Sequence, residues 1–253
     1  ELENKNMAIK KILISQRAPL NDAPYVALKE KFGVDITFKQ FFLIEPLSSR
    51  EFRAQRGNVL DYTAIIFSSR HTIDAFYGLC EELRVKVPET MKYFCTTEAV
   101  AMYLQKHIVY RKRKIFYGNG TPESIIEQIG SKHKGEKFLV TQSDSSNSSP
   151  LTNLMEAQKL DYKTAVFVKS VPQDLKDMNL TDYDMIVFYN PYDIKSLYEN
   201  FPEFQQGDIK FVAYGKSIVK AMEETGLKIE IQAPTPEAPS VARAIELYLE
   251  AHK

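Results

Sequence analysis

Short apolar runs alternate with helical patterns along the whole chain. Branched and aromatic residues predict strands at Lys11–Ser15, Val34–Phe41, Ala64–Ser68, Lys92–Cys95, Phe138–Thr141, Ala165–Val168, Met185–Tyr189, Lys210–Tyr214 and Lys228–Gln232. Between them, helical spacing predicts helices at Ala23–Lys31, Thr72–Leu83, Glu98–Gln105, Pro122–Ile129, Leu151–Lys159, Ile194–Glu199, Ser217–Thr225 and Ser240–Ala251. Because parallel strands need long crossovers, this alternation predicts an α/β fold whose parallel sheets are flanked by helices.

An internal repeat indicates that the chain holds two similar domains. The segment Asp61–Phe67 (DYTAIIF) matches Asp182–Phe188 (DYDMIVF), 121 residues further on. Downstream, Lys92–Thr97 matches Lys210–Gly215 at an offset of 118 residues. The alternative is that buried strands of unrelated origin resemble one another, since such strands are apolar in all α/β proteins.

Charge and composition exclude several classes of protein. The 253 residues include 33 Lys plus Arg and 33 Asp plus Glu, so the formal net charge is zero. The protein therefore has no overall positive potential that would attract nucleic acid or an anionic membrane. No apolar run approaches the roughly 18 residues that span a bilayer. The first residues, Glu1–Asn6, are polar and precede no apolar signal region. Together with the two cysteines, Cys80 and Cys95, which fit a reducing compartment, this predicts a cytoplasmic protein.

Most sequence signatures of catalysis are absent from the chain. It has no P-loop, no H-E-x-x-H pair and no G-x-S-x-G elbow. The histidines are scattered without ligand spacing, so a metal site is not expected. The segment Gly118–Glu123 (GNGTPE) lacks the third glycine of a dinucleotide fingerprint, and we interpret it as a helix start that Thr121 caps and Pro122 follows.

Two polar segments each allow two interpretations. The stretch Gln142–Pro150 (QSDSSNSSP) follows a strand, so it is either a surface loop or a ligand-binding loop at a carboxyl strand end. The basic run Arg111–Lys114 is either a solvated strand edge, protected from aggregation by its charges, or an anion contact.

A polar turn that starts a helix follows several strands. These turns are Ser68–His71, Thr96–Thr97, Asn190–Tyr192 and Gly215–Ser217. Each is explained by helix capping alone. The exposed amides of helix starts also bind carboxylates or phosphates, so several such turns together could hold a polyanion.

With these features in order, the sequence resembles the uroporphyrinogen-III synthase family over nearly its whole length. The matching pieces are Lys11–Arg17 (KILISQR), Ile65–Ser69 (IIFSS), Ile186–Pro191 (IVFYNP), Gly215–Ser217 (GKS) and the tail Ala233–Ala238 (APTPEA) before a terminal helix.

The resemblance implies two α/β domains joined by two extended strands, with one domain inserted in the other. Domain 1 would comprise residues 1–37 and 173–253, domain 2 residues 47–164, and the linkers residues 38–46 and 165–172.

The resemblance also implies the reaction. Members of the family cyclise hydroxymethylbilane, a linear tetrapyrrole, to uroporphyrinogen III; they invert ring D, release water and need no cofactor. The substrate has eight carboxylates, which the helix starts of an uncharged protein could bind. The resemblance suggests porphobilinogen deaminase as a partner and a monomer as the working form.

Several residues depart from the family pattern. A tyrosine often found near the second linker would fall at Phe167, and threonines of two helix starts are replaced by Val100 and Ile218. Thr97 stands where glycine is usual, and Ser146–Ser149 stand where an arginine is expected. No general acid is therefore assigned from the sequence.

From the residues and the resemblance together, we predict a uroporphyrinogen-III synthase. The predicted carboxylate contacts are Arg17, Ser68, Ser69, Thr97, Asn190 and Ser217. The missing polar residues motivate an alternative, a non-catalytic homologue that binds a tetrapyrrole or another polyanion. A third possibility is an unrelated two-domain protein that binds a small molecule.

Overall fold

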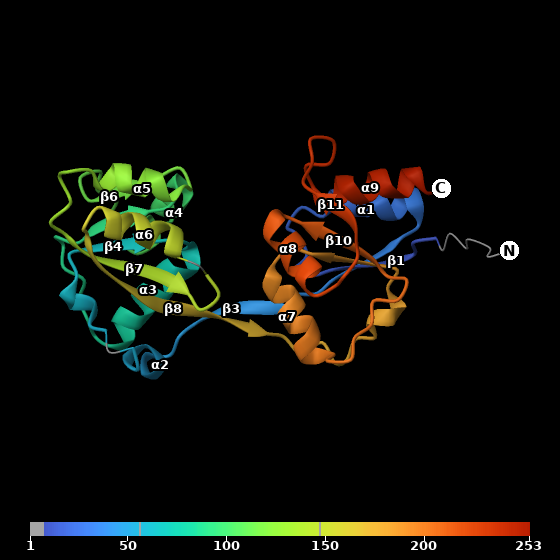
Figure 1. The fold of residues 1–253 in the computed structure, drawn as a ribbon, viewed down its shortest axis with the longest axis horizontal. Coiled ribbons are helices and arrows are strands. Elements are labelled where there is room, and N and C mark those ends of the chain that lie inside the picture. Colours follow the sequence, from blue (N-terminus) through green and yellow to red (C-terminus); the bar gives the residue numbers. More distant parts are fainter. Residues whose placement is uncertain (1–7, 56, 147) are drawn as a thin grey trace. The chain divides into compact units, whose positions relative to one another are not determined.

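The computed structural model describes residues 8–55, 57–146 and 148–253 (Figure 1). Its strands are β1 (Lys11–Ile14), β2 (Asp35–Phe38), β3 (Phe42–Pro46), β4 (Ala64–Phe67), β5 (Lys92–Cys95), β6 (Ile115–Tyr117), β7 (Lys137–Ser143), β8 (Asp161–Pro172), β9 (Met185–Phe188), β10 (Lys210–Tyr214) and β11 (Ile229–Ala233). Its α-helices are α1 (Ala23–Phe32), α2 (Ser49–Arg53), α3 (Arg70–Glu82), α4 (Glu98–Tyr103), α5 (Pro122–Ile129), α6 (Ser149–Ala157), α7 (Pro191–Asn200), α8 (Lys216–Glu224) and α9 (Val241–Ala251). The predicted α/β alternation is confirmed.

The chain divides into two compact units. Unit 1 holds the chain up to Leu43 and from Pro172 to Lys253, and unit 2 holds Ile44–Val171. The chain passes between the units in β3 and β8, which are neighbours at one edge of a sheet. Unit 2 is therefore a continuous segment inserted between the two parts of unit 1.

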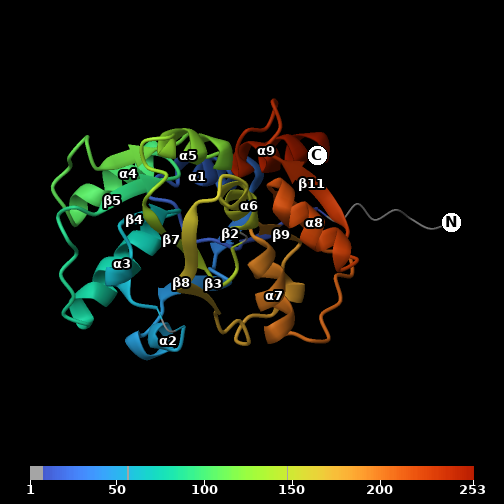
Figure 2. The same cartoon turned by 60° about the vertical axis from the view of Figure 1, so that its left-hand side comes forward.

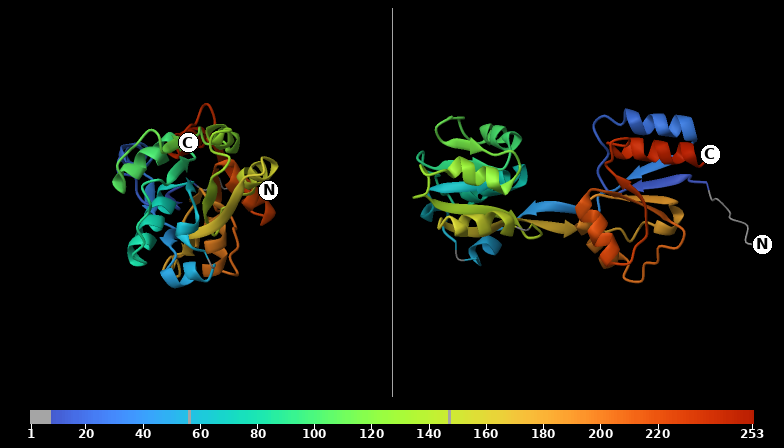
Figure 3. Two further views of the ribbon diagram at one scale, coloured as in Figure 1. Left: turned by 90° about the vertical axis from the view of Figure 1, so that its left-hand side faces the viewer. Right: turned by 45° about the horizontal axis from the view of Figure 1, so that its top comes forward.

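Unit 1 is a five-stranded sheet with helices on both faces. The strand order is β11-β10-β9-β1-β2, and every pair is parallel. Helices α1 and α9 pack side by side on one face (Figure 3), and α7 contacts α8. Alternate residues of each strand point to opposite faces of the sheet and so belong to different cores. Leu13 and Ile186 pack in the core that contains residues of α7. Ile12 and Met185 pack in the core that contains residues of α1.

Unit 2 repeats this architecture in a six-stranded sheet. Its order is β3-β8-β7-β4-β5-β6, and the strands from β8 to β6 are parallel (Figure 2). One core contains Phe76 of α3 and Phe67 of β4, and a second contains Ile125 of α5 and Met155 of α6. Each sheet is thus buried on both faces, as parallel sheets require.

One predicted strand is wrong as a single element. The segment Val34–Phe41 was expected to form one strand, but β2 ends at Phe38 and β3 begins at Phe42 in the other sheet. The polar pair Lys39 and Gln40 lies at the break, and the predicted strand ran past it to Phe41. Two short elements, α2 and β6, carry too little periodic signal and were also missed.

The basic run is the lead-in to an edge strand and is not itself a strand. Arg111–Arg113 are exposed, and residues 112–114 form a turn that enters β6, the last strand of its sheet. The Lys114 ammonium donates to the Glu89 carbonyl. The strand-edge interpretation is corrected to a solvated turn beside an edge strand.

Two further findings bear on the class of protein. Over the residues described, no helix is long and apolar enough to cross a membrane. Cys80 and Cys95 are both buried free thiols, and burial raises the pKa of Cys80 to about 11. Neither thiol is therefore a ready nucleophile near neutral pH.

Candidate functional site

Each sheet has one point where the strand order reverses. In unit 1 the chain runs outward from β1 to β2 and, in the other direction, from β9 through β10 to β11, so the reversal lies between β1 and β9. In unit 2 the corresponding point lies between β4 and β7. Ligands of open α/β sheets bind outside the carboxyl ends of strands at such switch points.

The carboxyl edge of unit 2 gathers three predicted site residues. Ser68 and Ser69 follow β4, and Thr97 follows the neighbouring strand β5. The Thr96 hydroxyl donates to the Ser68 carbonyl at 3.3 Å, which ties the two turns together. Ser69 is the N-cap of α3, and its hydroxyl accepts from the Thr72 amide at 3.1 Å.

Thr97 caps α4 in the same way. Its hydroxyl accepts from the Val100 amide at 3.3 Å, and its backbone is extended, with φ −138°. A glycine is therefore not needed at this position. Thr97 and Ser69 are both partly buried, whereas Ser68 is exposed. Two helix starts thus lie beside each other at this edge.

A glycine-containing loop closes the far end of the same edge. Gly118 donates its amide to the Cys95 carbonyl at 3.0 Å, and Gly120, at φ +94°, donates to Thr96 at 2.8 Å. A Cβ on Gly118 would lie 2.2 Å from the Ser124 hydroxyl oxygen. The predicted start of α5 is confirmed, because Thr121 caps the helix and Pro122 opens it.

The serine-rich segment 142–150 is bound to its surroundings where it is described. Asp144 accepts from the Ser170 amide at 3.0 Å, and its own amide donates to the Val168 carbonyl. The Ser148 hydroxyl donates to the Gln142 amide oxygen at 2.6 Å. Most of these polar atoms bond to β8 or to the segment itself, which is typical of a structured surface loop.

The carboxyl edge of unit 1 gathers the other three predicted residues. Arg17 follows β1, Asn190 follows β9 and Ser217 follows β10, and these strands are neighbours. All three residues are exposed. Asn190 caps α7 by accepting from the Tyr192 amide at 2.8 Å. Ser217 is not a cap, since α8 is entered through Gly215 at φ +107°.

Two side chains at the unit 1 edge were not predicted as site residues. Asp193 is 1% exposed, and its Oδ2 accepts from Ser15 Oγ at 2.9 Å and from the amides of Tyr189 and Asn190 at 2.9 and 3.1 Å. Burial raises the pKa of Asp193 to about 6 despite these three donors. The spacing Asn190-x-x-Asp193 is a capping-box signal that could have identified it.

Tyr189 is the second unpredicted residue. It is partly buried, and its ring lies 5.5 Å from that of Tyr214. Burial raises the pKa of Tyr189 and of its neighbour Tyr25, so both phenols stay protonated at neutral pH. These hydroxyls are neutral hydrogen-bonding groups and not phenolate bases.

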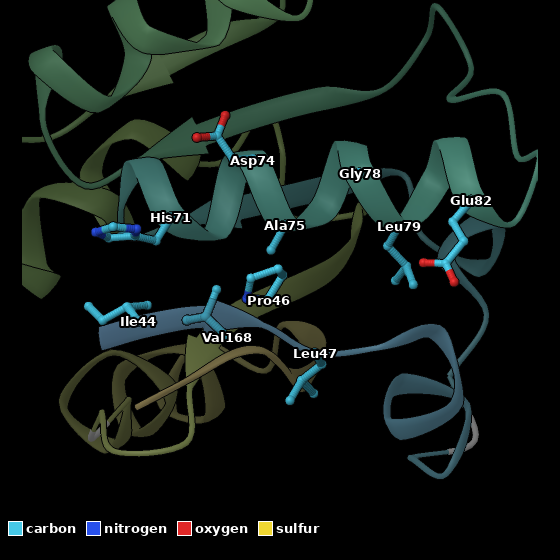
Figure 4. Close-up of a pocket in the computed structure, with 10 residues that line it drawn as sticks. All are labelled: Ile44, Pro46, Leu47, His71, Asp74, Ala75, Gly78, Leu79, Glu82 and Val168. Carbon is cyan, nitrogen blue, oxygen red and sulfur yellow. The ribbon is translucent and has the colours of Figure 1, made fainter. Parts of the chain in front are cut away.

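A cavity of about 390 Å³ lies within unit 2 (Figure 4). Apolar side chains, including Ile44, Ala75 and Val168, line it, and His71, Asp74 and Glu82 of α3 add polar groups. None of the six predicted site residues lines this cavity. We therefore assign the candidate site to the carboxyl ends of the strands and not to this cavity.

Three of the departures from the family pattern fall in the cores. Phe167, Val100 and Ile218 are 2%, 8% and 0% exposed. Phe167 packs against Phe52 and Phe76 at ring distances of 4.9 and 5.8 Å. These substitutions place apolar side chains in apolar surroundings.

The chemistry available at both edges is hydrogen bonding from helix starts and hydroxyls. Unpaired amides of a first helical turn carry partial positive charge and bind carboxylates. In the described part of the chain, no group of three or more His, Cys, Asp or Glu could hold a metal ion. Together, fold and site define a two-unit α/β protein of the kind that binds ligands at carboxyl strand ends.

Comparison with known proteins identifies the family. The model of Uroporphyrinogen-III synthase HemD matches residues 24–243. The chain belongs to the uroporphyrinogen-III synthase family. This match supports the predicted enzyme activity and does not favour the non-catalytic alternative.

Solved structures give the same fold. A uroporphyrinogen-III synthetase from Helicobacter pylori is similar with a TM-score of 0.59 at 17% identity, covering 96% of this chain and 100% of that one. A mutant uroporphyrinogen III synthase from Thermus thermophilus is similar with a TM-score of 0.55 at 15% identity, covering 96% and 98%. No curated protein matched the sequence.

Proposed function

We propose that this chain cyclises hydroxymethylbilane to uroporphyrinogen III, inverting ring D and releasing water without a cofactor. The observation that carries the proposal is the family match over residues 24–243. The polar strand ends agree with it, because a substrate with eight carboxylates needs many donors and this chain has no net charge.

Binding would use the residues predicted from the sequence. Ser68, Ser69 and Thr97 offer the helix starts of unit 2, and Arg17, Asn190 and Ser217 lie at the strand ends of unit 1. Shaping a flexible chain so that the correct ring carbon reacts is mainly a matter of positioning. We propose further that the two strands β3 and β8 act as the linkers between the units.

The setting of the enzyme follows from the same proposal. It would act as a cytoplasmic monomer and receive its unstable substrate from porphobilinogen deaminase. The buried apolar departures support retained activity, since Phe167, Val100 and Ile218 occupy core positions.

The test is a coupled assay. Hydroxymethylbilane is generated in situ, the protein is added, and the oxidised porphyrin isomers are separated by chromatography. Isomer III above the uncatalysed isomer I background supports the proposal. If only isomer I forms, and the protein has the circular dichroism spectrum of an α/β fold, the proposed activity is rejected. The non-catalytic homologue that binds a tetrapyrrole or another polyanion then becomes the favoured interpretation.

A further inference from the structure

The β1–α1 loop, residues 16–22, leaves the sheet of unit 1 directly after Ser15. Ser15 is 5% exposed, whereas every residue of the loop is exposed. The Ser15 amide donates to the Val187 carbonyl at 3.1 Å, and its hydroxyl donates to the Asp193 carboxylate at 2.9 Å. Among the described residues, the loop's own hydrogen bonds run only to the first turn of α1. The loop is therefore fixed to the sheet through Ser15.

The partner of the Ser15 hydroxyl lies in the first turn of α7. Asp193 is 178 residues distant from Ser15 in the chain. Its Oδ2 also accepts from the amides of Tyr189 and Asn190, which follow β9. One carboxylate oxygen thus joins the end of β1 to the turn after β9. Hydrogen bonds to a charged acceptor are stronger than those between neutral groups, and this one is buried.

The matching helix start in unit 2 shows that capping alone does not need a carboxylate. The repeat offset of 121 residues aligns Thr72 with Asp193. Thr72 completes the capping box of α3 by accepting from the Ser69 amide at 3.2 Å, and the other bonds of its hydroxyl also go to Ser69. A neutral residue is thus sufficient for the cap. What Asp193 adds is its reach to a neighbouring strand.

The carboxylate is also costly for the fold. Asp193 is 1% exposed, and it joins none of the ion pairs found among the described residues. Its Oδ1 is buried without a hydrogen-bond partner. Burial of an unpaired charge and of an unpartnered oxygen destabilises a folded protein. The bond to Ser15 is therefore the contribution that a neutral cap could not replace.

Two side chains of the β1–α1 loop have chemistry that suits a tetrapyrrole. Arg17 is a permanent cation that pairs with carboxylates. Leu20 is fully exposed, so it contributes no apolar burial to the fold. Its side chain gains stabilisation only when a ligand covers it, and the face of a pyrrole ring is an apolar surface. A loop with both groups complements a substrate made of pyrrole rings with acidic side chains.

We propose that Asp193 is a positioning residue, which through Ser15 fixes the base of the β1–α1 loop so that Leu20 packs on a pyrrole ring of the substrate. Arg17, in the same loop, keeps its predicted role as a carboxylate contact. This inference rests on the proposed function for the identity of the substrate. All of these residues belong to unit 1.

Single variants test the two halves of the proposal. Ser15→Ala removes the bond and leaves the α7 cap in place, and Asp193→Thr gives α7 the neutral cap of α3. Each is expected to raise the KM for hydroxymethylbilane about fivefold with less than a twofold change in kcat, and Leu20→Ala should do the same. Leu60→Ala is the control for Leu20, because Leu60 is an exposed leucine of the other unit. An unchanged KM in S15A or in L20A would overturn the proposal.

Double variants separate positioning from a general loss of stability. If Ser15 acts through Leu20, S15A/L20A should raise KM only about tenfold, below the roughly 25-fold of independent effects. S15A/D193T should match either single variant, since both remove one bond. Ser196→Ala is the matched control, because this buried hydroxyl of α7 donates to the Phe41 carbonyl. S196A should lower stability and leave KM unchanged. Independent effects in S15A/L20A would contradict the inference.

Two measurements by nuclear magnetic resonance do not depend on catalysis. The heteronuclear NOE values of residues 16–18 should fall in S15A and D193T, because the base of the loop is released. Porphyrin isomer I, the oxidised uncatalysed product, is then titrated into isotope-labelled protein. It should shift the amides of residues 16–22 and bind about fivefold more weakly to S15A.

These measurements distinguish failure of the inference from failure of the proposed function. If the loop amides shift but no isomer III is formed, the proposed activity fails and the role of the loop stands. If isomer III is formed but the loop amides do not shift, or the NOE values equal those of wild type, the inference is overturned.

If S15A or D193T fails to fold, Ser15→Cys takes its place. A thiol is similar in size to a hydroxyl but is a weaker donor. S15C should therefore change KM and the NOE values in the same direction as S15A and by less. Wild-type values of both in S15C would count against the inference.

Discussion

At the scale of single residues, the same side chain both caps a helix and lies at the candidate site. Ser69 accepts from the Thr72 amide, so its hydroxyl stabilises α3 while its turn presents the first amides of the helix. Removing the hydroxyl takes away the cap but leaves those amides in place. Binding and stability should therefore both weaken, and turnover should change less.

The double variant Ser68→Ala, Ser69→Ala tests this. It is expected to raise KM several-fold with a smaller change in kcat, and to lower the free energy of unfolding by about 1 kcal/mol through the lost cap. Steady-state kinetics and urea denaturation measure the two effects. Ser48→Ala is the matched control, because Ser48 caps α2 and should cost similar stability without raising KM. Equal loss of kcat and kcat/KM in the double variant would argue against a binding role.

The burial of Asp193 predicts a pH-dependent stability. Its pKa rises from 3.8 in the unfolded chain to about 6 in the folded protein, so the folded state holds the proton more tightly. This stabilisation is fully present below the unfolded pKa and is lost as the pH rises through 6. The difference in unfolding free energy between wild type and D193T should fall by about 1 kcal/mol from pH 5 to pH 7. A difference that stays flat in urea titrations at the two pH values would show that the carboxyl is not perturbed.

At the scale of elements, capping signals made several helix starts predictable. Thr121 with Pro122 marked the start of α5, and Asn190 with Pro191 marked that of α7. These signals are local, because a cap bonds within its own first turn. The assignment of β2 and β3 to different sheets was not predictable, because only the tertiary structure decides with which strand each of them pairs.

The charged turn before β6 gives an element-scale prediction. Replacing Arg111, Lys112 and Arg113 with glutamine should change KM less than twofold, because these residues are solvated and lie at the edge of the sheet. Kinetics at low and at physiological salt would check this. Arg17→Gln is the informative comparison, since Arg17 lies at the proposed site and its loss should raise KM. A large rise in KM from the triple variant would restore the anion-contact interpretation of this run.

The candidate site was only partly predictable from the sequence, because some of its residues are recognised by local signals and others only by their tertiary contacts. Residues that follow strands, such as Ser68, Thr97 and Asn190, were identified because strand ends of parallel sheets meet at one edge. Asp193 was missed because its importance depends on burial and on Ser15, which is 178 residues distant in the chain.

At the scale of the whole molecule, the two units have separate cores. The buried clusters around Phe67 and Phe138 use only residues of unit 2, and those around Phe188 and Val187 use only residues of unit 1. A hydrophobic core contained in one continuous segment is what an independently folding domain requires. Unit 2 meets this condition, whereas unit 1 is assembled from two distant parts of the chain.

A fragment of residues 44–171 is therefore expected to fold alone. Its urea denaturation should be cooperative and should coincide when followed by circular dichroism and by tyrosine fluorescence. The fragment should form no isomer III, because Arg17, Asn190 and Ser217 belong to the other unit. A fragment that unfolds without cooperativity would show that β3 and β8 need the rest of the chain for support.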